Sequence, residues 1–504
     1  MRSILIGSLL ALLVAGSAEA QLAKQWVRHH NGGGNSEDYG RHAATDSEGN
    51  VYLTGQATNA AGEVEMLTVK YDQNGSEQWA RTYPAAGGGP DFGQAIAIDG
   101  AGNAIVAGDS VGVGGDYDIV VLKYSSSGTL LWSQRYDGPG GSFDAMQAPN
   151  LALDGNGDVI VGGTSIGVGT YLDAVVLKYS SAGALLWEAR HGDPTYTSDG
   201  CYGLQVDAAG NVHAMTWTVN PASSYDIVTL KYDPDGALLW EQQYDGPAAG
   251  EDFGYSILLD SSANVLVTGY SAGVGSGNDV VTIKYDPDGG LLWAQRYNGS
   301  ANRDDYGLTL ATNDLGFVAV TGTSESPYHS PATTLLYDAS GNLFWTRTFE
   351  TSDVWVGNGS GLGCAFDADG NLFVGVWGWG GPPVGHAAFL VEYAQDGTLL
   401  FEDQHDSVIH ADDIAFLASL DGAGNVVLVG YSQRGSQQVD TLLIKYGAKT
   451  KIAPVAGPPE DEDPIQPLLQ ATPRKPAHAQ LRSVSERLPE PLKRLPLSGG
   501  RSLR

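Results

Sequence analysis

Cysteine, methionine, charged residues and long apolar runs are all scarce in this sequence. Its 504 residues include two Cys and four Met, and only 17% are charged. Two cysteines exclude a disulfide scaffold and a zinc-cysteine module, and the absence of apolar runs beyond the N-terminus argues against a membrane bundle. Basic residues are scarcer still, because 27 Lys and Arg face 58 Asp and Glu, a formal charge of −31. Such a surface repels nucleic acid and anionic lipid and suits cations or cationic partners.

The N-terminus has the layout of a secretory signal peptide. Arg2 precedes an apolar stretch over residues 4–15, and Ala18-Glu19-Ala20 is a typical cleavage site. We therefore expect residues 1–20 to be removed and a soluble monomer to be exported to the periplasm, the cell surface or the medium. A lipid anchor is not expected, because no Cys follows the cleavage site. An uncleaved anchor is the alternative, although the stretch is short for a membrane span.

The C-terminus differs in composition from the rest of the chain. Residues 448–504 are rich in proline, carry an acidic cluster at 460–463, and contain ten Lys or Arg against six Asp or Glu. This composition predicts a disordered tail that is a solvated linker, with a tether or a partner segment as the alternative. The tail contributes +4 to the charge and residues 1–20 contribute none, so residues 21–447 carry −35.

The segment 21–447 has an internal period of about 53 residues. Tryptophan marks seven of the eight units and Phe401 stands in the last place, at Trp26, Trp79, Trp132, Trp187, Trp240, Trp293 and Trp345. A tyrosine recurs with the same period at Tyr71, Tyr124, Tyr179, Tyr232, Tyr285, Tyr337, Tyr393 and Tyr446. A period of this length indicates a repeat architecture rather than an ordinary globular domain.

Each unit contains four short β-rich runs separated by turn residues. In the second unit these runs are residues 95–99, 104–108, 118–124 and 130–136. The first two runs are joined by D-x-x-G-N, in which Asp and Asn bond their own backbone and Gly supplies positive φ, so they form a hairpin. Four short antiparallel strands repeated eight times predict an all-β fold, an eight-bladed β-propeller of four-stranded blades.

The paired motifs D-x-x-G-N and K-Y-D-x-x-G-x-x-x-W, as in residues 231–240 and 284–293, resemble exported bacterial β-propeller repeat proteins of the SBBP type. The resemblance covers roughly residues 22–447. That family name implies seven blades, whereas this chain shows eight units. Leu336 and Glu392 replace the Lys and Phe401 replaces the Trp, so packing in blades six to eight is expected to differ. The resemblance implies a structural repeat without a common reaction.

The phase of the repeat predicts how the ring closes. Trp26 precedes any complete unit, and the last unit stops at Tyr446 without its Trp strand. The N-terminal strand, about residues 22–29, should therefore complete the last blade. Losing that strand should destabilise the propeller more than its length suggests, because the closed ring has no free sheet edge at this join.

Aromatic residues outside the period indicate a binding surface. The loops that join second to third strands and successive blades are the longer ones, as at 110–118, 271–279, 350–361 and 377–387. We call the side that they share the long-loop face. Aromatic side chains expected there suit sugar rings or proteins. The ligand-binding candidates are Trp217, Tyr270, Trp355, Trp377, Trp379 and Tyr431. The alternative is that they fill gaps between blades, and it is favoured for Trp217, Tyr270 and Tyr431.

An aspartate recurs at the start of seven predicted first strands: Asp38, Asp91, Asp144, Asp199, Asp252, Asp305 and Asp413. Four of them stand in D-Y-G or D-F-G. We favour a turn-capping role, because a residue needed in nearly every blade usually holds backbone. The alternative is calcium bound by carboxylates at one mouth of the channel, with Asp38, Asp91, Asp252, Asp305 and Asp413 as metal candidates. No resident cofactor is expected otherwise.

Motifs that suggest catalysis lack the context that catalysis needs. G-x-S-x-G occurs at 108–112, 163–167 and 269–273, but no helix should follow, as a nucleophile elbow requires. His405 and His410 lie near Asp412 and Asp413 without a metal-binding motif, and D-x-N-x-D at 154–158 is too short for a calcium loop. Cys201 and Cys364 should be free buried thiols, since they lie three blades apart.

These observations favour an exported, noncatalytic module that binds a glycan, peptide or protein at or beyond the cell envelope, with no catalytic residues. A second hypothesis is an enzyme, because the D-x-x-G-x-x-x-W unit is similar to that of quinoprotein dehydrogenases, which bind pyrroloquinoline quinone and calcium. Here the spacing differs by one residue and their adjacent cysteine pair is missing. A third is an envelope assembly scaffold. Fold by itself does not choose among them.

Overall fold

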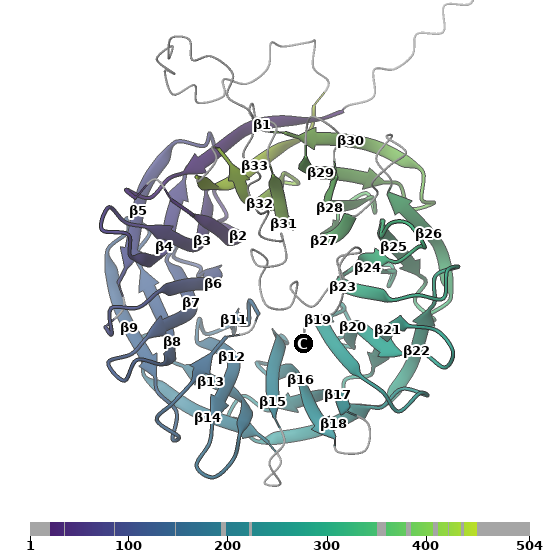
Figure 1. The fold of residues 1–504 in the computed structure, drawn as a ribbon, viewed down its shortest axis with the longest axis horizontal. Coiled ribbons are helices and arrows are strands. Elements are labelled where there is room, and N and C mark those ends of the chain that lie inside the picture. The colour runs from purple at the N-terminus through teal and green to yellow at the C-terminus, as the bar shows by residue number, and fades with distance from the viewer. Residues whose placement is uncertain are drawn as a thin grey trace, which may run out of the picture.

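A computed structural model describes residues 21–450, except for residues 35, 85, 147, 193–197, 221–223, 350–358, 380–384, 407–411, 422 and 435–437. Within these ranges it contains strands and no helix, in eight antiparallel sheets around a common centre (Figure 1). The eight-bladed propeller is therefore confirmed. The predicted signal peptide and residues 451–504 of the tail lie outside the described residues. The described residues therefore include no helix that is long and apolar enough to cross a bilayer.

Blades 1 to 4 follow one another along the chain. Blade 1 contains β2 (Tyr39–Thr45), β3 (Val51–Thr58), β4 (Val64–Tyr71) and β5 (Glu77–Tyr83), and blade 2 contains β6 (Asp91–Ile98), β7 (Ala104–Val111), β8 (Tyr117–Tyr124) and β9 (Leu130–Tyr136). Blade 3 contains β10 (Asp144–Ala145), β11 (Leu151–Leu153), β12 (Val159–Ile166), β13 (Leu172–Tyr179) and β14 (Leu185–His191). Blade 4 contains β15 (Asp199–Val206), β16 (Val212–Asn220), β17 (Ser224–Tyr232) and β18 (Leu238–Tyr244).

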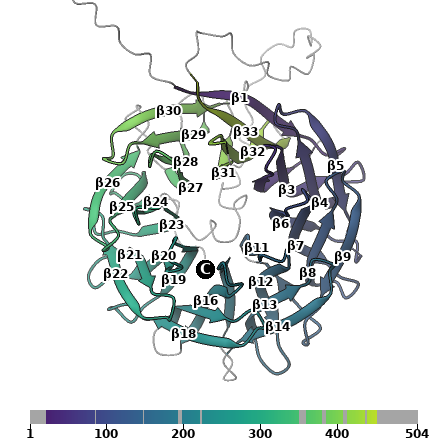
Figure 2. The same ribbon diagram turned by 180° about the vertical axis from the view of Figure 1, so that it is seen from behind.

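Blades 5 to 8 continue the ring, which the view from behind also shows (Figure 2). Blade 5 contains β19 (Asp252–Leu259), β20 (Val265–Ala272), β21 (Asn278–Tyr285) and β22 (Leu291–Tyr297), and blade 6 contains β23 (Asp305–Thr312), β24 (Val318–Ser324), β25 (Ala332–Tyr337) and β26 (Leu343–Phe349). Blade 7 contains β27 (Gly359–Phe366), β28 (Leu372–Trp379), β29 (His386–Tyr393) and β30 (Leu399–His405). Blade 8 contains β31 (Asp413–Leu420), β32 (Val426–Gln433), β33 (Val439–Thr450) and β1 (Gln21–His30).

Blade 8 closes the ring as the phase of the repeat predicts. Strand β1 pairs antiparallel with β33, so the N-terminal strand is the outer strand of the last blade. Strand β33 continues to Thr450, which lies opposite Gln21. The closing strand is held to its blade by interstrand hydrogen bonds, without the short turn that joins third and fourth strands elsewhere.

Blade 3 is the exception to the four-strand pattern. Its first strand is split into β10 and β11, which both pair with β12. Trp132 and Trp187 are 55 residues apart instead of 53, and the two extra residues lie in the first strand of this blade, where Pro149 also stands. Because proline has no N–H to donate to a ladder, the strand breaks at this point.

The tryptophans of the fourth strands link each blade to the next. The indole N–H of Trp187 donates to the carbonyl of Pro234 at 2.9 Å, in the turn between β17 and β18 of blade 4. Seven such links recur around the ring, from Trp26, Trp79, Trp132, Trp187, Trp240, Trp293 and Trp345. The repeated Trp is thus an interblade contact, worth about 1 kcal/mol of net hydrogen bonding at each link.

The recurrent lysine pairs with the aspartate of the first hairpin in its own blade. Lys123 lies 2.9 Å from Asp99, and Lys284 lies 2.8 Å from Asp260. Blade 6 has lost both partners together, because Leu336 replaces the lysine and Asn313 replaces the aspartate. Blade 6 therefore lacks this Lys–Asp ion pair, and its packing differs here as the Leu336 substitution predicts.

Phe401 has no N–H to donate, and the join between blades 7 and 8 is built differently. Its ring packs edge-on against Tyr446, with the ring centroids 6.4 Å apart. The Tyr446 hydroxyl donates to Asp403 at 2.8 Å, and Lys24 of β1 lies 2.9 Å from the same carboxylate. An ion pair to the closing strand thus takes the place of the tryptophan link.

Candidate functional site

Four of the six aromatic candidates lie between blades rather than on an open rim. Trp217, Tyr270, Trp377 and Tyr431 are between 1% and 7% exposed. Each stands near the end of a second strand, six residues after the hairpin Asn, and the turn chemistry of that hairpin fixes its register. Trp355 lies outside the described residues, and of Trp379 the structure places only the backbone, at the end of β28. Ligand binding by these six residues stays a prediction.

Three of these residues pack on the aromatic residue of a D-Y-G or D-F-G motif in the next blade. Tyr431 packs edge-on against Tyr39 of blade 1 at 4.9 Å between centroids, Trp217 stacks on Phe253 of blade 5 at 6.3 Å, and Tyr270 meets Tyr306 of blade 6 at 5.2 Å. Trp377 belongs to the same buried cluster as Ile414 of blade 8. The aromatic residue of a second strand thus packs against the residue that follows the recurrent Asp in the next blade. Neither motif shows this contact along the sequence.

Four of the seven recurrent aspartates cap the loops that enter their blades. All seven are fully buried. Asp252 Oδ2 accepts the backbone N–H of Gly246 at 2.6 Å, and Asp144 and Asp305 accept those of Gly138 and Gly299 at the same distance. Asp38 accepts two backbone N–H groups, from Gly32 and Thr58. The turn-capping interpretation is confirmed at these four positions.

Burial has an electrostatic cost at these caps. It raises the pKa of Asp305 to about 6, against the opposing effect of hydrogen bonds from Ser324 and Gly299. Burial likewise raises the pKa of Asp38 and of Asp252. The backbone donors are therefore needed to keep these carboxylates inside the fold.

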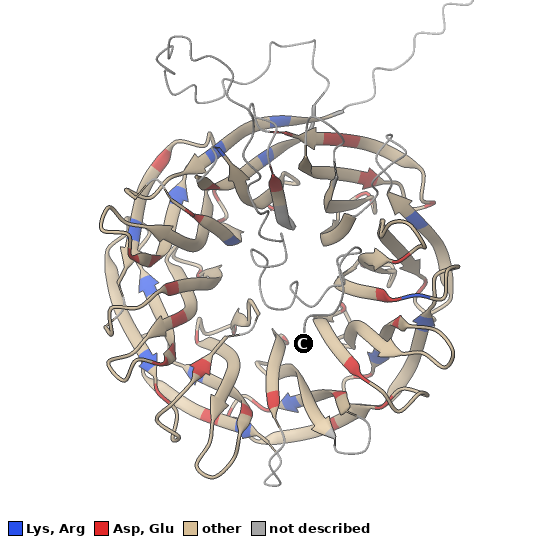
Figure 3. Cartoon of the chain, viewed as in Figure 1, with Lys and Arg blue, Asp and Glu red and all other residues tan. Residues whose placement is uncertain are grey.

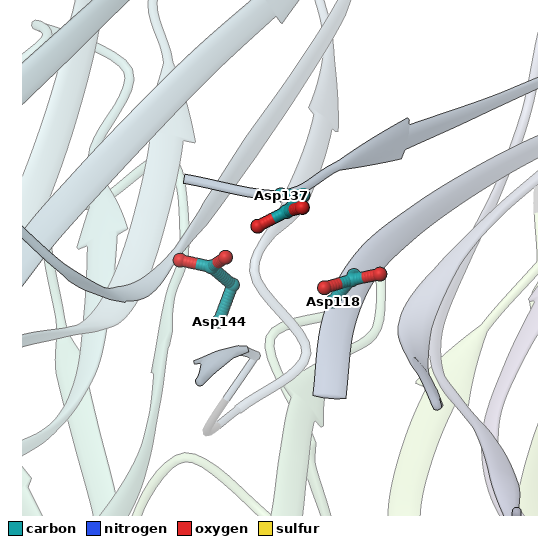
Figure 4. A group of neighbouring side chains, drawn as sticks. All are labelled: Asp118, Asp137 and Asp144. Atoms are coloured by element: carbon teal, nitrogen blue, oxygen red, sulfur yellow. The ribbon is translucent and has the colours of Figure 1, made fainter. Parts of the chain in front are cut away.

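Two blade junctions bring three carboxylates together. Asp118, Asp137 and Asp144 face one another between blades 2 and 3 (Figure 4), with one oxygen of each within 4.8 Å of the others. Asp226, Asp245 and Asp252 form the equivalent group between blades 4 and 5. Arg135 donates to Asp118 at 2.7 Å, whereas Gln243 stands at the corresponding place and donates to Asp226 at 2.6 Å. These residues of the described structure could hold a cation.

Of the five metal candidates, only Asp252 belongs to such a group within the described residues. Asp38, Asp91, Asp305 and Asp413 each stand at a separate blade junction. Calcium binding stays a prediction, and the measurement that tests it is a calcium titration of the melting temperature.

The three G-x-S-x-G serines belong to a network inside their blades. Ser110, Ser165 and Ser271 are buried, and each hydroxyl accepts a hydrogen bond from an arginine of the fourth strand: Arg135, Arg190 and Arg296. The same arginines pair with Asp118, Asp173 and Asp279 at 2.7–2.9 Å. The motif therefore builds the blade instead of exposing a nucleophile, as the missing helix predicts.

The remaining candidate residues have structural partners. Asp154 and Asp158 form a hairpin in which Asp154 pairs with Lys178 at 2.9 Å. His405 is buried, Asp412 bonds His386 at 2.9 Å, and His410 lies outside the described residues. Cys201 and Cys364 are free and buried as predicted, and burial raises the pKa of both thiols to about 12.

The long-loop face carries exposed apolar residues that sequence reasoning missed. Val113, Val168, Val274 and Tyr328, here called the loop tips, are 76–90% exposed. They lie in the connections between second and third strands of blades 2, 3, 5 and 6, which all emerge on one face. The three valines stand in tight turns; in one of them Gly273 N–H donates to the Gly277 carbonyl at 2.9 Å. The detectable signal was Gly-Val-Gly, repeated at 112–114, 167–169 and 273–275.

The comparisons with known proteins find similarity at low sequence identity. No protein-family model matches the sequence. An uncharacterised WD repeat-containing protein of Acanthamoeba polyphaga mimivirus is 22% identical over 452 residues, a match that covers 73% of this chain and 29% of that protein. The chain thus spans less than a third of the length of that relative.

Among solved structures, Chaetomium thermophilum Sqt1 bound to the N-terminus of the ribosomal protein L10 has a TM-score of 0.51 and 11% identity, covering 83% of this chain and 99% of that one. The WD40 domain of SCAP from fission yeast has a TM-score of 0.42 and 10% identity, covering 85% and 99%. The Sqt1 similarity supports the propeller fold.

Proposed function

We propose that this protein is an exported, noncatalytic β-propeller that binds a protein or peptide partner through its long-loop face. The observation that carries the proposal is the set of loop tips. Four apolar side chains stand almost fully in solvent on one face, at the ends of turns that do not need them for packing. Apolar groups gathered at loop ends on a rigid scaffold are typical of protein contacts.

Charge favours a basic partner. The segment 21–447 carries −35, and Asp and Glu outnumber Lys and Arg around the ring (Figure 3). An acidic surface speeds encounter with a cationic partner and repels an acidic one. The Sqt1 complex supports the proposal as a propeller of similar shape with a polypeptide segment bound to it.

The test uses the mature chain, residues 21–504, and two matched variants. The first changes the loop tips to serine: Val113→Ser, Val168→Ser, Val274→Ser and Tyr328→Ser. The second changes four exposed leucines away from this face: Leu130→Ser, Leu131→Ser, Leu185→Ser and Leu186→Ser. We expect an envelope or extracellular protein retained by the wild-type chain to be lost with the first variant and kept with the second. Equal retention by both would contradict the proposal.

A cross-linking experiment tests directly which face of the propeller contacts the partner. Val274→Cys and Leu292→Cys both lie in blade 5, on opposite faces, and the native thiols are buried with raised pKa values and so react slowly. A thiol-attached photo-cross-linker should capture the partner from position 274 and not from 292. Retention of polysaccharide instead, with the same dependence on the loop tips, would move the ligand from protein to glycan.

A further inference from the structure

The C-terminal segment leaves the propeller on the side opposite the long-loop face. In blades 1 to 7 the third strand runs from the second-to-third loop to a short turn that leads to the fourth strand. The short turns of both hairpins in each blade define the short-turn face, for example at 99–103 and 233–237. Strand β33 is a third strand, so its end at Thr450 lies on this face. Whatever follows Thr450 therefore starts beside the short turns.

The short-turn face is rimmed by paired apolar side chains. The two residues that open each fourth strand of blades 2 to 7 are 43–60% exposed: Leu130 and Leu131, Leu185 and Leu186, Leu238 and Leu239, Leu291 and Leu292, Leu343 and Phe344, and Leu399 and Leu400. At the corresponding places blade 1 has Glu77 and Gln78, and blade 8 has Lys24 and Gln25. An apolar pair repeated in six blades is more than the scattered exposure that a soluble surface shows.

In blades 4 and 5 the leucine pairs follow strongly acidic turns. The sequences are D-P-D-G-A-L-L at 233–239 and D-P-D-G-G-L-L at 286–292, in adjacent blades. Asp235 and Asp288 are exposed, and Asp233 and Asp286 are half-buried. The turns before the pairs of blades 2 and 3 contain serine and no acid.

The preceding blade brings a buried lysine, but no arginine, to each of these two turns. Lys178 Nζ donates to the Pro234 carbonyl at 3.3 Å and Lys231 Nζ to the Pro287 carbonyl at 2.9 Å, and each lysine also pairs with an aspartate of its own blade. Two residues after the tryptophan, Arg28, Arg81 and Arg347 reach the turns of blades 1, 2 and 7 through hydrogen bonds to turn carbonyls. Before blades 4 and 5 the same place holds Ala189 and Gln242. Blades 4 and 5 therefore offer four carboxylates and four leucines side by side.

The end of the chain has the complementary composition. Residues 474–504 contain eight Lys or Arg, two Asp or Glu and six Leu. The 23 residues between Thr450 and this segment span up to about 80 Å when extended, against an expected radius of gyration of about 22 Å for a compact chain of roughly 430 residues. The segment can therefore reach any blade on the face from which it leaves.

We infer that residues 474–504 bind in cis to the short-turn face of blades 4 and 5. The leucines of the segment cover Leu238, Leu239, Leu291 and Leu292, and its Lys and Arg side chains face the carboxylates of the two turns. The long-loop face stays free for the partner proposed above, and the inference does not depend on that partner.

The test is limited digestion of the mature chain, residues 21–504, by trypsin at low salt, because Lys and Arg residues along 474–504 provide cleavage sites that report the accessibility of the segment. Cleavage within this segment should be slowed at least about tenfold relative to the variant Leu238→Ser, Leu239→Ser, Leu291→Ser and Leu292→Ser, as binding shifts the open population by that factor. The double variant Asp235→Lys, Asp288→Lys should also be cleaved faster than the wild type within this segment, because it removes the charge attraction and keeps the leucines. Leu130→Ser with Leu131→Ser, a leucine pair without acidic turn residues, should leave the protection intact.

Each other outcome overturns the inference. Equal cleavage in the wild type and the blade 4 and 5 variants means that the segment is not bound there, and protection that all variants keep means that it binds elsewhere. Protection that rises with protein concentration means binding to a second copy instead of in cis. The melting temperature of each variant, matched to the wild type, separates these results from unfolding.

Discussion

At the residue scale, the repeat is a set of contacts that tolerate little substitution. The glycine of each third-to-fourth strand turn shows this best. Gly236 has a φ of +89°, and a Cβ placed on it would lie 2.8 Å from the ring of Trp187 in the preceding blade. The glycine is thus required twice, by the left-handed backbone and by the tryptophan that covers it.

We predict that Gly236→Ala lowers the free energy of unfolding by about 3 kcal/mol, the sum of left-handed strain and overpacking against the indole. The matched control is Gly370→Ala, since Gly370 also has a positive φ but its Cβ would meet nothing within 4 Å. That variant should lose only about 1 kcal/mol. Urea unfolding measures both, and equal losses would show that the indole contact is unimportant.

At the scale of the element, strand β1 is the least securely joined of the outer strands, because hydrogen bonds rather than a turn connect it to β33. Trp26 anchors it to blade 1 by donating to the Gln73 carbonyl at 3.0 Å. We predict that Trp26→Phe and Trp187→Phe each cost about 1 kcal/mol in unfolding free energy. Only Trp26→Phe should also speed hydrogen exchange in the β1–β33 ladder, by about tenfold. Similar exchange in both variants would mean that the join is as firm as any other.

Acid should loosen the same join first. Burial, with nearby positive charge, lowers the pKa of His29 on β1 to about 3 and that of His405 on β30 to about 4. Because these folded-state values lie below the 6.5 of an unfolded histidine, their contribution to stability is complete above pH 6.5 and is lost as the pH falls towards 4 and 3.

As the pH falls from about 6.5 towards 3, the rate of hydrogen exchange in the β1–β33 ladder should therefore rise more than the rate in the β16–β17 ladder of the same molecule, after correction for intrinsic rates. His405→Phe should reduce the difference, since it removes one of the two protonations. A variant that exchanges as the wild type does at low pH would show that the histidines do not cause the effect.

At the scale of the whole molecule, like charge opposes the closed ring. Residues 21–447 carry −35, and this self-repulsion is screened by salt. We predict that the melting temperature rises by a few degrees when NaCl increases from about 10 mM to about 200 mM at neutral pH. Near pH 4, where many carboxylates are protonated, the rise should be smaller. A rise of the same size at both pH values would point to a general salt effect instead of screening.

The period, the hairpin motifs and the unpaired ends of the repeat determined the strand order, the number of blades and the closure by β1. They could do so because turn chemistry and alternation are local, and because repetition makes each local signal count eight times. The roles of the recurrent polar residues were also accessible: Asp252 caps a turn, and Ser271 belongs to a blade and not to a nucleophile elbow.

Only the tertiary structure decided what each side chain meets across a blade interface. Trp217 and the phenylalanine of D-F-G at Phe253 lie 36 residues apart and belong to different motifs, and they become partners because the ring sets one blade against the next. The same geometry buries Trp217, Tyr270 and Tyr431, as the gap-filling alternative predicts, and it buries Trp377 as well. It leaves Val274 in solvent at the end of a turn. Sequence repetition specifies the blade, whereas exposure depends on how eight blades pack around one axis, which no single repeat contains.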